Sequence, residues 1–213
     1  MVSILFSCKK TEVKDELLDL GYSYYPLDSG WVKMYSVDSI SFNDNTGKID
    51  TFQFLLLEEN NGLISAQGLN QHVEITRKVL FKNSLVWEPR TSLFAIQTNS
   101  NLQVVSDNIR LVKIVFPIGS VLNWNGNQYT NLGKRTFFMQ NLGFSFSNQD
   151  TVFNNCIQVQ EALANNAIEE VLIRSVYCKG IGLVDFVNNN LNTQSSGKSG
   201  YLVHQKLVFY KRP

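Results

Sequence analysis

The sequence lacks any apolar stretch of the roughly 20 residues that a helix needs to span a bilayer, and it has little charge. Charged residues make up 17% of the 213 residues, and the formal net charge is only +1. Lysine and arginine stand singly among acidic residues and form no basic stripe, so we expect no nucleic-acid partner. Hydrophobic residues make up 44%, which supplies a sizeable core and excludes a disordered chain.

Signals for metals, cofactors and catalysis are also scarce. His72 and His204 have no Cys or His at zinc-ligand spacing, so we expect two ordinary strand residues and no metal site. Residues 43–50 are rich in oxygen ligands, but the EF-hand register would put Phe42 at the first ligand position, so we predict a turn. There is no Gly-x-Ser-x-Gly elbow and no phosphate-binding loop. We therefore predict no cofactor and a protein that is not an enzyme.

Two pairs of adjacent carboxylates remain as candidates for acid/base chemistry, Glu58-Glu59 and Glu169-Glu170. Neighbouring residues on a strand point to opposite faces of a sheet, so neither pair can meet over one substrate. We expect all four side chains to lie at solvated strand ends.

Short segments that alternate in hydrophobicity or are rich in β-branched and aromatic residues follow one another from Tyr22 onward. Residues 31–59 are typical of a β-hairpin with its turn at 43–48. Connectors rich in Asn, Gly and Ser separate the later segments, and no long helical pattern occurs. We predict a mainly β fold with little helix: a single antiparallel domain whose curved sheet closes into a clam-like half-barrel, or alternatively a β-sandwich. Further strands are expected at 72–81, 92–98, 109–117, 135–146, 151–162, 167–180, 181–189 and 201–212.

Cys156 and Cys178 lie on successive predicted strands. If the turn between them centres on Asn165 and Asn166, Cys156 pairs with Ser175 and Cys178 points to the other face. A shift of one residue would put both cysteines on one face. Two free thiols are therefore favoured, and a disulfide is the alternative.

Cys8 follows a short apolar run, and Leu5-Phe6-Ser7-Cys8 resembles the box at which a lipoprotein signal is cleaved. The polar residues after it are typical of a tether, with a helical turn over 14–21. We expect residues 1–7 to be the remainder of a signal peptide, Cys8 to carry the lipid, 8–21 to be the tether and 22–213 the β domain. The alternative is a buried Cys8 at an ordinary chain start.

Four aromatic residues surround the start of the predicted β domain: Tyr22, Tyr24, Tyr25 and Trp31. Tyrosines beside a proline on a segment that precedes a strand can rim a pocket or stack on a carbohydrate, so these four are our candidate ligand-binding residues. The alternative, which burial statistics favour, is that they pack across one end of the sheet.

Two stretches of the chain resemble a broad group of uncharacterised Bacteroidetes-type cell-envelope lipoproteins. One contains Tyr-Tyr-Pro-Leu at 24–27, Gly-Trp at 30–31 and Asp-Ser-Ile at 38–40; the other contains Val-Tyr-Cys-Lys-Gly-Ile-Gly-Leu-Val at 176–184. The resemblance implies a mostly β lipoprotein held at the outer membrane, and it brings no catalytic residues. We expect binding of an apolar or carbohydrate ligand, or alternatively a structural role beside an envelope protein partner.

Overall fold

The computed structural model describes residues 19–67, 70–148, 151–195 and 197–213. Within these ranges, twelve strands form one antiparallel sheet, and the one helical element is the 3-10 turn η1 (Tyr22–Tyr24). The mainly β fold with little helix is confirmed, and the curved sheet is found instead of the sandwich. The strands are β1 (Val32–Asn43), β2 (Lys48–Gln67), β3 (Asn70–Phe81), β4 (Glu88–Gln97), β5 (Asn101–Ser106), β6 (Ile109–Val115), β7 (Asn123–Asn125), β8 (Thr136–Asn148), β9 (Thr151–Asn165), β10 (Glu169–Cys178), β11 (Gly182–Gln194) and β12 (Gly197–Lys211).

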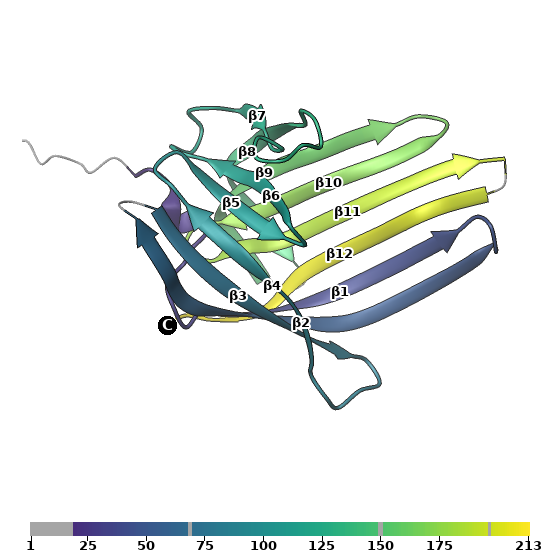
Figure 1. Ribbon diagram of the computed structural model, residues 1–213, viewed down its shortest axis with the longest axis horizontal. Coiled ribbons are helices and arrows are strands. Elements are labelled where there is room, and N and C mark those ends of the chain that lie inside the picture. The colour runs from purple at the N-terminus through teal and green to yellow at the C-terminus, as the bar shows by residue number, and fades with distance from the viewer. Residues whose placement is uncertain (1–18, 68–69, 149–150, 196) are drawn as a thin grey trace, which may run out of the picture.

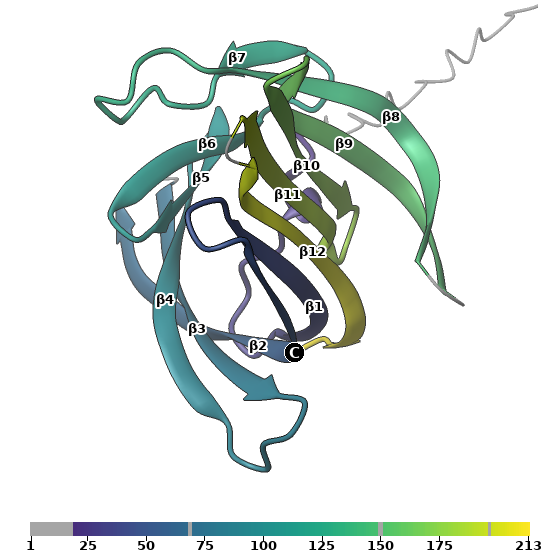
Figure 2. The ribbon, with the colours of Figure 1, turned by 90° about the vertical axis from the view of Figure 1, so that its right-hand side faces the viewer.

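The sheet is a pair of meanders joined in the middle. Its strand order is β6-β5-β4-β3-β2-β1-β12-β11-β10-β9-β8-β7, so the first and last strands pair at the centre. Long strands cross the molecule, with η1 and the C-terminus at the same end (Figure 1). Seen along the strands, the sheet curls around an interior (Figure 2). The fold is therefore a sheet nearly closed into a barrel.

The two edge strands meet at a narrow seam. The Val112 amide of β6 donates to the Gly126 carbonyl, just after β7, at 2.9 Å. The indole N–H of Trp124 donates to the Val112 carbonyl at 2.8 Å. A Cβ on Gly126 would lie 2.4 Å from the Phe137 ring, so only glycine lets the chain approach this closely. The seam satisfies edge groups that would otherwise be open to another chain.

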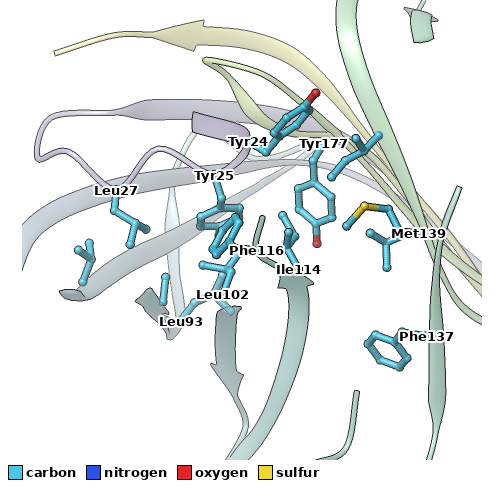
Figure 3. Packing of buried hydrophobic residues seen from close by; sticks show 14 of the residues in the cluster. Tyr24, Tyr25, Leu27, Leu93, Leu102, Ile114, Phe116, Phe137, Met139 and Tyr177 are labelled. Carbon is cyan, nitrogen blue, oxygen red and sulfur yellow. The ribbon is translucent and has the colours of Figure 1, made fainter. Parts of the chain in front are cut away.

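One core cluster fills the interior beside η1, and it joins the N-terminal segment to both halves of the sheet. Tyr25 and Tyr177 project into it side by side (Figure 3), with ring centroids 6.1 Å apart. The alternation of buried residues along the strands is the pattern that a one-sided apolar face requires. Other members are Leu27, Val73, Ile75, Leu93, Ala95, Leu102, Ile114, Phe116, Phe137, Met139, Ile157 and Val159.

Cys156 and Cys178 form a disulfide, so the favoured free-thiol interpretation is wrong. The β9–β10 pairing begins with Asn165 opposite Glu170, which on its own would put Cys156 opposite residue 179. Between Ala162 and Gln160 the register shifts, because Glu161 is an extra residue in β9. This β-bulge moves Cys156 directly opposite Cys178. Neither the turn position nor the bulge was evident in the sequence.

The expected strands agree with the structure except in Asn-rich segments. β5 was not predicted, β7 lies in a segment expected to be a connector, and the connector expected at 192–200 is mostly strand. In each case backbone pairing with a neighbouring strand sets the outcome, against the turn-forming Asn, Gly and Ser residues in or beside the segment. The hairpin expected at 31–59 is confirmed, with Asn43 Oδ1 accepting hydrogen bonds from the Asn45 and Thr46 amides in its turn.

The predicted lipidation site Cys8, the residual signal peptide 1–7 and most of the tether lie outside the described residues, so those assignments stay predictions. The last tether residues contact the domain. Leu20 accepts a hydrogen bond from the Ile118 amide, and Asp19 forms an ion pair with Lys179. In the part of the chain that the structure describes, no helix combines the length and hydrophobicity needed to cross a membrane.

Candidate functional site

A cavity of about 330 Å³ lies inside the curled sheet. Strands β2 to β6 line one side and β10 to β12 the other, and Tyr25 adds a ring from the N-terminal segment. The volume is within the range of small-molecule sites. Most of its lining is apolar, from Leu93, Val104, Ile109, Leu111, Tyr177, Leu183 and Phe186.

Glu58 is a buried carboxylate that lines this cavity, with 7% of its surface exposed. The expectation of a solvated strand end was wrong for this residue, because β2 continues to Gln67 and leaves Glu58 in mid-strand. Burial raises the pKa of Glu58 above its usual value, and the nearby Lys33 and Arg77 oppose that rise. The Tyr35 hydroxyl, which donates to the Leu183 carbonyl at 3.2 Å, also opposes the rise in the Glu58 pKa.

Glu169 and Glu170 are exposed at a strand end, as expected, whereas Glu59 is half-buried in mid-strand. Glu59 lies on the opposite face of β2 and pairs with Lys78 at 2.9 Å. Glu169 and Glu170 begin β10 in solvent. Only Glu58 therefore remains as a candidate for contact with a bound molecule.

The sheet register sets the charges beside Glu58. Lys33 of β1 and Arg77 of β3 are its direct neighbours on either side, so three charged side chains share one face of three adjacent strands. The Arg77 Nε donates a hydrogen bond to the Thr91 carbonyl at 2.7 Å, and this bond positions the guanidinium. Arg77 also lines the cavity. Glu58 and Arg77 thus face the cavity together, and Asp107 and Lys113 also line it.

Lys33 is buried against aromatic rings. Its Nζ lies 5.2 Å from the Tyr25 ring centroid and 5.5 Å from that of Trp31. Burial lowers the pKa of Lys33 to about 8, with Glu58 acting in the opposite direction. A Cβ on Gly182 would lie 2.7 Å from this ammonium, so the glycine leaves the space that the lysine occupies.

A second buried charge pair crosses the interior. Lys113 of β6 contacts Glu161 of β9 at 2.6 Å, and Ser175 donates to the same Glu161 carboxylate at 3.1 Å. The β-bulge that places Cys156 opposite Cys178 therefore also directs Glu161 toward Lys113 and Ser175, which line the cavity. Because Lys113 is matched by this partner, Arg77 is the cation left for a ligand in the cavity.

The structure brings the four predicted aromatic residues to one end of the sheet. Tyr24, Tyr25 and Trp31 are buried, Tyr22 packs edge-on against Phe116 at 4.8 Å, and of the four only Tyr25 lines the interior cavity. The sequence analysis considered Glu58 but assigned it to a solvated strand end, and it did not identify Arg77 or most of the cavity wall, since these residues come from eight strands whose pairing one sequence does not reveal. Ligand binding by the four aromatics stays a prediction.

The histidines lie apart from each other. His72 is half-buried in β3, whereas His204 of β12 contacts Asp185 at 2.7 Å on the sheet face opposite the cavity. Arg174 is 3.5 Å from the same carboxylate. Across the described ranges, no three His, Cys, Asp or Glu side chains gather closely enough to hold a metal ion.

No protein-family model matches the chain, and no curated protein matches it. Among solved structures it is similar to a protein described as exported, with a YmcC-like fold, from Bacteroides fragilis, at 10% identity and a TM-score of 0.48 over 88% of this chain and 98% of that one. A protein described as a lipoprotein from Parabacteroides distasonis gives the same identity, coverage and TM-score. A DUF1329 family protein from Desulfovibrio piger gives 11% identity and a TM-score of 0.21 over 87% of each chain. TM-scores this low at such identities establish neither a shared family nor an activity.

Proposed function

We propose that the protein is a non-catalytic lipoprotein of the cell envelope, anchored through Cys8 at the outer membrane, that holds an apolar ligand inside its curled sheet. The observation that carries the proposal is the interior cavity, which is open on one side and lies between two halves of one sheet, with an apolar majority in its lining. Glu58 and Arg77 are among the polar groups of the lining that would orient a ligand in such a site.

The disulfide supports an extracytoplasmic location. Structural disulfides form and persist in oxidising compartments such as the periplasm and the cell surface. With Cys156 and Cys178 paired, Cys8 is the one cysteine of the sequence left for another role. It stands in a lipobox-like context, and acyl chains on it would contribute roughly 0.8 kcal/mol per buried methylene to membrane binding.

A cavity-filling substitution tests the binding function. The apolar fluorophore N-phenyl-1-naphthylamine should bind the purified domain with increased emission, and Val104→Phe should weaken that binding about tenfold by occupying the space. Ile109→Trp is a second variant, at a cavity residue that is already 42% exposed and tolerates replacement.

The matched control is Val152→Phe, which makes the same change at a side chain with 60% exposure outside the cavity. Equal fluorophore affinity in the wild type and in all three variants would place the dye on the surface and reject the cavity as its site. Thermal unfolding of each variant separates lost binding from lost folding.

Lipidation has its own test. Metabolic labelling with a fatty-acid analogue should mark the protein in its native cell and should not mark Cys8→Ala. Equal labelling of the two forms would reject the anchor and leave the cavity proposal untouched.

A further inference from the structure

A second pocket, of about 460 Å³, lies at the end of the sheet that η1 crosses. Residues of the 22–28 segment and Trp31 line it together with Gln71, Gln97, Gly180 and Arg212. It shares only Tyr25 with the interior cavity. The two sequence stretches singled out above, near 24–31 and 176–184, therefore meet at this end pocket.

The end pocket gathers polar side chains that the fold does not satisfy. Gln97 is nine-tenths buried, with 9% exposure, and its amide makes no hydrogen bond within the described residues. Ser23 Oγ and the indole N–H of Trp31 are also buried there without a partner in those ranges. More than about 90% of buried polar groups in folded proteins are hydrogen-bonded, so these two exceptions beside the unpaired Gln97 side chain are consistent with polar groups available to a ligand.

Arg212 adds a cation that the fold leaves unused. Its guanidinium lies 6.0 Å from the Trp31 ring centroid and, among the residues the structure describes, makes neither an ion pair nor a hydrogen bond. A Cβ on Gly180 would lie 3.9 Å from Arg212 Nη2, an ordinary contact distance, so Gly180 and the guanidinium are neighbours in the pocket wall. Among the described residues, substitution of Arg212 therefore removes the contact with the Trp31 ring but no hydrogen bond or ion pair.

The balance of charge and hydrogen-bonding groups indicates the class of ligand. Asp28 offsets Arg212, so the lining carries no net charge and favours neither a free anion nor a free cation. Amides, a carboxylate and a guanidinium together offer both acceptors and donors, as hydroxyl groups require. Tyr22, Tyr25 and Trp31 contribute aromatic surface to the same walls, against which the apolar face of a ring can pack.

We propose that the end pocket binds a neutral sugar unit, with Gln97 and Arg212 as its hydrogen-bonding residues. This site is separate from the apolar cavity, and either can exist without the other. Its volume falls within the roughly 300–1,000 Å³ range of small-molecule sites.

Saturation-transfer NMR with glucose, galactose, mannose, N-acetylglucosamine and glucuronic acid tests the proposal. At least one neutral sugar should bind the wild-type protein at roughly 10 mM. Gln97→Leu and Arg212→Met should each weaken that binding about tenfold, because each removes a hydrogen-bonding group. Arg212 is exposed and lies outside the strands, so we expect its variant to keep the fold.

Two controls make the outcome specific. Lys211→Met removes a neighbouring exposed cation outside the pocket, and Val104→Phe fills the other cavity; both should leave sugar binding unchanged. The proposal is overturned if no neutral sugar binds, if glucuronic acid binds more tightly than every neutral sugar, or if the Gln97 and Arg212 variants bind like the wild type. None of these results bears on binding of the apolar fluorophore.

Discussion

Lys113 on β6 reaches across the interior of the curled sheet to Glu161 on β9, where its ammonium contacts the carboxylate at 2.6 Å. Glu161 is 3% exposed and is the extra residue of the β9 bulge. The pair therefore connects two halves of the sheet whose edge strands touch only at a narrow seam. It also neutralises a cation that would otherwise face the apolar cavity.

Replacing one partner of this ion pair should destabilise the protein more than replacing both. Lys113→Met leaves a buried carboxylate without its cation and should lower the free energy of unfolding by about 3 kcal/mol. Lys113→Met combined with Glu161→Gln should recover most of that loss. Urea denaturation measures the free energy of unfolding of Lys113→Met, Glu161→Gln and the double variant. If the loss in the double variant equals the sum of the losses in the two single variants, the two side chains do not interact.

The disulfide should be present in exported protein and should stabilise the domain. Under denaturing, non-reducing conditions, iodoacetamide should leave Cys156 and Cys178 unmodified. Replacement of both by alanine should lower the free energy of unfolding by about 2–4 kcal/mol, since the loop that the bond closes is free in the unfolded variant. Alkylation of both thiols without a reductant would contradict the observed pairing.

Lys33 should give the domain a distinctive pH dependence. Its pKa is about 8 in the folded protein, below the usual lysine value of 10.5, so between these values the unfolded chain holds more protons than the folded one. The free energy of unfolding should therefore rise as pH increases from about 8 to 10, by at most about 3 kcal/mol in total. Urea denaturation across this range measures the rise.

Lys33→Met is the matched control for that measurement, because it keeps the length of the side chain and every other titrating group. The difference between the wild-type and variant curves isolates the lysine from the buried tyrosines, whose raised pKa values act at still higher pH. Two parallel curves would mean that Lys33 does not titrate below its usual value.

Glu58 should orient the cavity ligand without supporting the fold to the same extent. Its pKa is raised by burial, so the carboxylate carries a desolvation cost that Glu58→Gln removes. We expect this variant to be at least as stable as the wild type near neutral pH and to bind a fluorophore carrying an amine less tightly. Unchanged affinity for such a probe would place Glu58 outside the ligand contact.

Local patterns in the sequence were sufficient for the hairpin at 31–59, because alternation in β1 and the Asn43 turn are both encoded by near neighbours. Local patterns did not predict the features that depend on which residues pair between strands. A single bulge residue, Glu161, changes the partner of Cys156, and the extension of β2 to Gln67 turns Glu58 from a strand end into a cavity wall. Tyr25 was predicted as a ligand-binding residue through its place in a tyrosine-rich segment, whereas Glu58 was considered and assigned to solvent.

Whether the curled sheet holds an apolar ligand can be measured by native mass spectrometry of protein extracted from its own membrane in mild detergent. We expect a non-covalent adduct of one discrete mass that is present in the wild type and in Val152→Phe and is lost from Val104→Phe. An adduct-free spectrum of folded wild-type protein, or the same adduct in all three forms, would contradict it.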